Sequence, residues 1–150
     1  MDKVPMGSIT SRLAALRPAP RCSEIILSDG NVLEDCRRIR WLVTALARHH
    51  AVDLVAMRQR CGQLLNARNY LPLPLAPDLL LVPLPLAGSG EKLGYVNFHC
   101  IENKEGDRDS RFELTGDTVL ECFLSRATLE RRLLAARYVA MCLGNSSPFL

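Results

Sequence analysis

Cysteine and histidine are the residue types in this chain with the greatest potential for metal or nucleophilic chemistry. No two cysteines form a CxxC pair, and the three histidines lie apart from them except where His99 precedes Cys100. A structural metal site needs paired ligands at short spacing, and neighbours on a strand point to opposite faces. We therefore expect reduced, buried thiols, and neither a metal nor another cofactor. The cysteines are Cys22, Cys36, Cys61, Cys100, Cys122 and Cys142.

Other patterns typical of enzymes are also missing from the sequence. The acidic residues of 102–109 could form carboxylate pairs for acid–base catalysis, but a segment so rich in both charges is typical of a solvated loop. Gly88, Gly90 and Gly94 lack the GxGxxG spacing and the following helix of a dinucleotide site. There is no GxxxxGK[ST], GxSxG or HExxH motif. The sequence therefore predicts a protein that is not an enzyme.

Arginine is the remaining candidate for chemistry, because the arginines are segregated. Residues 37–70 hold seven arginines and a single acid, and residues 123–143 hold four arginines and a single acid, whereas acids outnumber bases over 101–122. Each phosphate that a basic residue neutralises releases bound counterions, so clustered arginines give affinity for nucleic acid. The alternative is that these arginines only form the polar faces of amphipathic helices. The net charge of +3 is compatible with both.

Two helices should carry the first arginine group. Residues 23–27 (SEIIL) read as a strand that ends at the turn Asp29-Gly30, and apolar residues then recur at helical spacing over 33–49. Asp53 is a plausible N-cap for a second helix over 54–65. The pattern predicts a strand followed by two helices.

The second half of the chain should form a sheet and one covering helix. Apolar and β-branched runs separated by turn residues predict about five antiparallel strands over 71–75, 79–86, 94–101, 111–114 and 118–124. Ser125 can cap a helix over 126–142 that covers them. No internal repeat is visible. We expect an α+β fold with a single domain over residues 22–145, a flexible N-terminal arm over 1–21 and a tail over 146–150.

The most unusual stretch is YLPLPLAPDLLLVPLPL, residues 70–86, which is apolar and holds five prolines. A membrane helix is excluded because the stretch contains Asp78, has fewer than about 20 apolar residues and lacks backbone donors at its prolines. Prolines two residues apart remove donors from one edge of a strand and leave the other edge able to pair. The run therefore predicts two strands guarded at one edge. A PxxP ligand is a less favoured alternative.

Two family resemblances follow from the apolar and turn residues. The C-terminal pattern is similar to the closing pattern of LytTR-type DNA-binding domains over about forty residues. It consists of Val96-Asn97, Ile101, Leu114, Gly116, Val119, Ser125-Arg126, Leu129 and Leu133. A longer part of the chain, from Arg58 onward, resembles the competence transcription factor (ComK) family. The matching positions there are Gly62, Leu65, Pro72, Leu73, Leu75, Pro77 and Pro83.

The ComK resemblance implies a cytoplasmic bacterial transcription regulator that binds A/T-rich promoter DNA as an oligomer, largely through the minor groove. The N-terminus has no apolar run of signal-peptide length, which also favours the cytoplasm. Arginine suits this role, since the narrow minor groove of A/T tracts attracts guanidinium groups. The alternative function is an adaptor or antagonist that keeps the regulator fold without binding DNA. The candidate DNA contacts are Arg126, Arg131, Arg132, Arg137, Arg58, Arg60 and Arg68.

Overall fold

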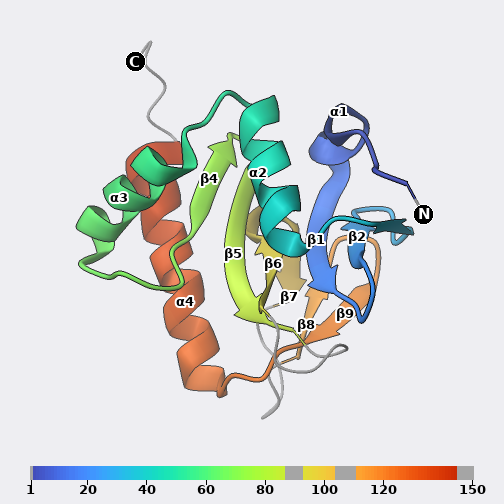
Figure 1. Ribbon diagram of the computed structural model, residues 1–150. Helices are drawn as coiled ribbons and strands as arrows, with labels where there is room; N and C mark the ends of the chain where they lie inside the picture. The colour runs from blue at the N-terminus through green and yellow to red at the C-terminus, as the bar shows by residue number, and fades with distance from the viewer. Residues whose placement is uncertain (1, 87–92, 104–110, 145–150) are drawn as a thin grey trace.

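The computed structural model describes residues 2–86, 93–103 and 111–144, and it confirms the expected α+β class (Figure 1). Its strands form a six-stranded antiparallel sheet, in the order β3-β2-β1-β6-β5-β4, and a three-stranded antiparallel sheet, in the order β7-β8-β9. An isolated bridge between Leu86 and Cys122 connects the chain beyond β5 with the chain beyond β9. The expected tail over 146–150 lies outside the described residues.

The elements follow the chain in a simple order. The first half comprises α1 (Met6–Ile9), η1 (Thr10–Arg12), β1 (Leu13–Pro18), β2 (Ser23–Leu27), β3 (Val32–Asp35), α2 (Ile39–His49) and α3 (Leu54–Leu65). The second half comprises β4 (Leu73–Ala76), β5 (Leu79–Pro85), β6 (Leu93–Asn97), η2 (Phe98–Cys100), β7 (Ile101–Asn103), β8 (Arg111–Leu114), β9 (Thr118–Glu121), α4 (Arg126–Val139) and the π-helical turn η3 (Ala140–Gly144).

The N-terminal segment is the largest correction to the sequence analysis. The expected flexible arm over 1–21 is wrong, because β1 lies inside the large sheet, between β2 and β6. Residues 13–16 (LAAL) are all buried. A strand that is buried on both faces shows no alternation of apolar and polar residues. The pattern of four apolar residues therefore does not distinguish a strand from any other buried segment.

The expected helix over 33–49 is wrong at its start. It begins at Ile39, and Leu33 instead belongs to β3, where it pairs with Ile25 of β2. Leu33, Cys36 and Ile39 have helical spacing, but Cys36 is exposed in the connection between β3 and α2. The predicted turn Asp29-Gly30 is confirmed and closes the β2–β3 hairpin, with Gly30 at φ +91°.

Both predicted capping residues are confirmed. The Asp53 side chain accepts a hydrogen bond from the Ala56 N–H at 3.1 Å, and α3 begins at the next residue. The Ser125 hydroxyl accepts one from the Thr128 N–H at 3.2 Å, and α4 begins at the next residue. Each cap satisfies one of the amides that a helix leaves unpaired at its N-terminus.

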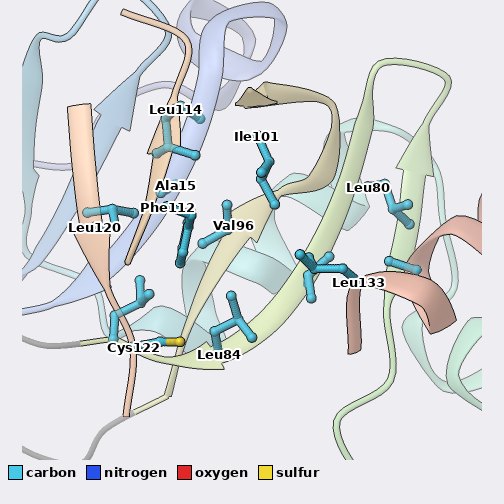
Figure 2. Close-up of a cluster of buried hydrophobic side chains, with 14 of the residues drawn as sticks. Ala15, Leu80, Leu84, Val96, Ile101, Phe112, Leu114, Leu120, Cys122 and Leu133 are labelled. Carbon is cyan, nitrogen blue, oxygen red and sulfur yellow. The ribbon is translucent and has the colours of Figure 1, made fainter. Parts of the chain in front are cut away.

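The predicted single meander is wrong, because its strands divide between two sheets. The strand expected over 94–101 ends at Asn97, where η2 turns the chain into the small sheet, and the strand expected over 118–124 ends at Glu121. In Figure 2, the buried residues of the small sheet face those of β5, β6 and α4. The small sheet and α4 therefore bury one face of the large sheet.

The opposite face of the large sheet is buried under α1 and α2 (Figure 1). Alternation along β5 separates the two cores, since Leu80 and Val82 belong to the cluster with α4, and Leu79 and Leu81 to the cluster with α2. Burial on both faces explains why β5 reads as a continuous apolar run.

Pro83 and Pro85 lie in the part of β5 where one edge has no neighbouring strand within the described residues. Pro83 and Pro85 lie opposite Tyr95 and Leu93 of β6, whereas β4 pairs with β5 only as far as Leu81. Beyond that point the β5 carbonyls have other partners. The Pro83 carbonyl accepts from Arg132 at 3.4 Å, and the Pro85 carbonyl accepts from the Phe123 N–H at 2.9 Å. The predicted effect of proline spacing is confirmed here: one edge pairs with β6 from Leu81 to Pro85, and beyond Leu81 the other edge has no neighbouring strand in the described part of the chain and only the isolated bridge at Leu86.

The chain contains an internal repeat that the sequence analysis missed. The first repeat (η1, β1, β2, β3 and α2) has the same order of elements as the second repeat (η2, β7, β8, β9 and α4). Their strand registers also agree. Leu13 pairs with Leu27 before an irregularity in β1, and Ile101 pairs with Leu114 before an irregularity in β7. The repeats therefore share their topology and their pairing.

A backbone hydrogen bond also occurs at equivalent positions of the two repeats. The N–H of Ser28 donates to the Arg12 carbonyl at 2.7 Å, and that of Thr115 donates to the Cys100 carbonyl at 2.8 Å. From Glu24 in β2 to the end of α2, each residue corresponds without a gap to the one 87 positions later, so that Ile39 and Arg126 both begin a helix. Few residues are identical, which explains why the sequence analysis missed the repeat. The identical pairs in the described repeats are Leu27/Leu114, Val32/Val119, Leu33/Leu120, Glu34/Glu121, Leu42/Leu129 and Leu46/Leu133.

Candidate nucleic-acid interface

A polar groove runs along α3 and the chain that leaves it. It is a widely open hollow of about 770 Å³, and its lining contains two arginines, three side-chain amides and no acidic residue. The lining residues are Arg58, Gln59, Gly62, Gln63, Asn66, Ala67, Arg68 and Leu71. We call this feature the α3 groove. A concave surface with positive charge and several hydrogen-bonding groups is suited to a polyanion.

The chain forms the groove by reversing tightly at the end of α3. Asn66 adopts the left-handed conformation, with φ +50°, and ends the helix. The Ala67 N–H then donates to the Gly62 carbonyl at 3.0 Å. A Cβ at Gly62 would lie only 2.8 Å from the Ala67 carbonyl oxygen, so this close return requires glycine. The reversal brings Arg68 to the same groove as Arg58.

The polar side chains of the α3 groove can make contacts of two kinds. Arg58 and Arg68 can bind phosphate oxygens with their guanidinium groups. Gln59, Gln63 and Asn66 can each donate and accept hydrogen bonds, which suits either base edges or the sugar–phosphate backbone. Within the ranges that the structure describes, neither arginine forms an ion pair. Both guanidinium groups are therefore available to a ligand.

Two of the predicted arginines on α4 have contacts inside the protein instead. Arg126 forms an ion pair with Glu130 one turn later, with Nε and Oε1 3.1 Å apart, and its side chain is only 20% exposed. Arg132 lies over the ring of Tyr70, 3.9 Å from its centroid, and donates to the Pro83 carbonyl. Arg132 thus connects α4 with Tyr70 and β5, whereas Arg126 is paired within its own helix. Because both guanidinium groups already have partners, they are poor candidates for a first contact with DNA.

Arg132 should therefore matter for stability. We expect Arg132→Ala to lower the free energy of unfolding by roughly 1–2 kcal/mol, because it removes a cation–π contact and leaves the Pro83 carbonyl without this donor. Arg131→Ala is the matched control, since Arg131 is exposed and its side chain bonds only to Thr128 on the same helix among the described residues. Urea unfolding of both variants would measure the difference, and equal losses would contradict this role for Arg132.

The remaining predicted residues are exposed but do not form one site. Arg58 and Arg68 share the α3 groove, whereas Arg60 and Arg131 lie outside its lining, and Arg137 lines a different hollow beside α4. The two helices are neighbours in Figure 1, but the arginines outside the groove do not share its lining. Asn66 was missed by the sequence analysis, because its contribution depends on the left-handed end of α3.

A second basic hollow lies at the start of α2, on the first repeat. It encloses about 320 Å³ and includes Arg21, Arg38 and Arg40 together with the thiols of Cys22 and Cys36. Burial, and then the charges of nearby glutamates, raise the pKa of the Cys22 thiol. A thiol with a raised pKa stays protonated at neutral pH, which makes it a weak nucleophile.

The other shifted thiols behave in the same way. Burial raises the pKa of both Cys61 and Cys100, which lie in or against the core. The predicted role of these cysteines as small apolar residues agrees with their positions.

Among the helices of the described residues, none combines the length and the apolar character needed to cross a membrane. Comparisons of the chain with protein-family models, with curated proteins and with solved structures found no match.

Proposed function

We propose that this protein is a cytoplasmic DNA-binding transcription regulator that contacts A/T-rich duplex DNA through the α3 groove. The observation that carries the proposal is the composition of this groove: two arginines without an ion pair among the described residues, three amides and no acid. The family resemblance of the proline and glycine positions supports the same function.

The chemistry of the groove fits A/T-rich DNA. A narrow minor groove concentrates negative potential, and a guanidinium group enters it readily. Arg58 and Arg68 are the proposed primary contacts, and the neighbouring amides can bond to base edges or sugars. Arg60 and Arg131, which are exposed on α3 and α4, would add phosphate contacts outside the groove. Binding as an oligomer would place several such surfaces on one promoter.

The test compares two double variants that change the net charge equally. Arg58→Ala/Arg68→Ala should lower affinity for an A/T-rich duplex at least about tenfold at 0.1 M salt, and should reduce the slope of log K against log salt by about 1.8, since each lost phosphate contact removes roughly 0.9. Arg21→Ala/Arg38→Ala, in the hollow near α2, should keep most of the affinity and the slope. Fluorescence anisotropy over a salt series measures both quantities.

Two results would reject the proposal. One is binding that does not depend on salt, and the other is an equal loss of affinity in both double variants. A protein that binds no duplex even at low salt would instead support the adaptor or antagonist. That second candidate is favoured by one observation, the large exposed apolar residues near the end of α4, Leu134, Tyr138 and Met141.

A further inference from the structure

The internal repeat shows that one face of α4 lacks the cover that α2 has. In the first repeat, α1 packs against α2 (Figure 1), and Met6 and Ile9 share a buried cluster with Val43 and Ala47. Val43 and Ala47 are 1% and 2% exposed. In the first repeat, the short apolar helix α1 therefore covers this side of α2.

The equivalent side of α4 is open. Glu130 and Leu134 occupy the positions of Val43 and Ala47, and Leu134 is 63% exposed. Among the described residues, no helix covers them in the way that α1 covers α2, because the residues before η2 form β6, which pairs on both sides in the large sheet. In the second repeat, the segment before η2 therefore forms strand β6 and not a covering helix.

A hollow marks the open side of α4. It encloses about 240 Å³ and is lined by Phe98, Arg126, Glu130, Leu133, Leu134 and Arg137. Phe98 begins η2 just as Thr10 begins η1, so the hollow lies where the segment before η1 lies in the first repeat. Two further exposed apolar residues, Tyr138 and Met141, continue from Leu134 at helical spacing. Large apolar residues that gather on one helix face are typical of an interaction surface.

The charges around the hollow indicate what kind of partner fits. Arg126 and Glu130 neutralise each other in their ion pair. Arg137 forms no ion pair with any described residue. A partner that covers the hollow would desolvate this guanidinium group, so a carboxylate on the partner is needed to compensate it.

We propose that this hollow binds a short amphipathic helix of a partner protein, with apolar residues one turn apart against Phe98 and Leu134 and a carboxylate against Arg137. Such a helix would take the place that α1 takes in the first repeat. The hollow shares no lining residue with the α3 groove, so partner binding is a property beyond the proposed DNA binding and can be measured without DNA.

The test is a selection from a displayed library of twelve-residue peptides against the full chain without DNA. We expect enriched peptides with apolar residues at i and i+3 or i+4 and with Asp or Glu nearby. Leu134→Glu should weaken their binding at least about tenfold, because it places a charge where apolar contact is made. Val55→Glu is the matched control, since Val55 is an exposed apolar residue of α3 and should leave binding unchanged. Urea unfolding confirms that both variants fold.

A charge reversal tests the electrostatic part separately. A second selection, against Arg137→Glu, should enrich basic residues in place of acidic ones. The proposal is overturned if no helical pattern is enriched, if Leu134→Glu binds the selected peptides as well as the wild type does, or if Arg137→Glu selects the same acidic peptides. It is also overturned if sedimentation shows a wild-type dimer that Leu134→Glu dissociates, because a second copy of the chain would then cover this face.

Discussion

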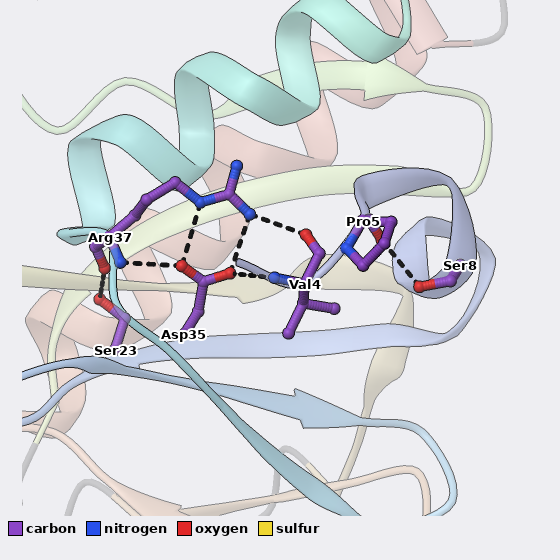
Figure 3. Close-up of polar contacts among 6 residues, drawn as sticks. All are labelled: Val4, Pro5, Ser8, Ser23, Asp35 and Arg37. Atoms are coloured by element: carbon purple, nitrogen blue, oxygen red, sulfur yellow. Dashed lines mark hydrogen bonds and ion pairs between the residues drawn. The ribbon is translucent and has the colours of Figure 1, made fainter. Parts of the chain in front are cut away.

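Arg37→Ala is expected to lower the free energy of unfolding by about 3–5 kcal/mol, which is the usual loss when one partner of a buried ion pair is removed. Asp35 is fully buried, and its carboxylate has Arg37 as its counter-ion (Figure 3). Without the guanidinium group, this charge would remain inside the protein with no opposite charge beside it.

The geometry explains why the loss should be so large. The Arg37 side chain donates to both carboxylate oxygens of Asp35, from Nε at 3.0 Å and from Nη2 at 2.8 Å, and also to the Val4 carbonyl at 2.7 Å. The carboxylate accepts two further bonds, from the N–H of Val4 at 2.7 Å and of Arg37 at 2.8 Å. One ion pair thus connects the N-terminal segment, β3 and the start of α2.

Arg38→Ala is the control for this result. Arg38 is the next residue, is exposed and forms no ion pair within the described ranges, so its loss should change stability by no more than about 0.5 kcal/mol. Urea unfolding at neutral pH compares the two variants. Similar losses would show that Asp35 does not depend on Arg37.

Acid unfolding provides a second measurement of the same contacts. Burial by itself would raise the pKa of Asp35, but the hydrogen bonds from Arg37 and from the Val4 N–H, with the Arg37 charge, outweigh it and lower the pKa below its ordinary value. The folded pKa is then below the unfolded value of about 3.9. The stabilisation is therefore complete above that pH and is lost as the pH falls through the folded pKa. Arg37→Ala should weaken this part of the acid dependence.

The sequence predicts some elements of this fold well because their signals are local. Asp53 and Ser125 each fix the first residue of a helix through a bond within the next turn. The prolines of β5 act in the same way, because each removes its own donor whatever surrounds it. Features of this kind need no knowledge of distant residues.

The missed features depend on contacts between distant parts of the chain. Residues 13–16 become a central strand only because β2 and β6 pair with them, and nothing in LAAL itself indicates that. In the candidate site, the missed feature is instead a local backbone conformation that the residue types do not indicate. The sequence pattern places Arg58 on a helix. Arg68 lines the same groove only because the chain reverses at Asn66. The contact of Arg132 with Tyr70 joins segments that are far apart in the sequence.

The two repeats meet at their hairpin turns, which makes this contact a sensitive point of the fold. The turn around Gly116 in the second repeat lies against the turn around Gly30 in the first. Both glycines have positive φ, +92° and +91°. A Cβ at Gly116 would clash with the Ser28 carbonyl oxygen and lie 2.7 Å from the Gly30 nitrogen. Because these atoms belong to the backbone, they cannot move aside as a flexible side chain could.

Gly116→Ala should therefore lower the free energy of unfolding by at least about 2 kcal/mol, since strain at a positive φ of order 1–3 kcal/mol adds to the clash between the turns. Gly7→Ala is the control: Gly7 lies in α1 at a φ that alanine accepts, and a Cβ there would approach only the His49 ring, at 3.2 Å. Thermal and urea unfolding should show a large loss for Gly116→Ala and little change for Gly7→Ala. If both alanines were tolerated, close packing of the two turns could not be what joins the repeats.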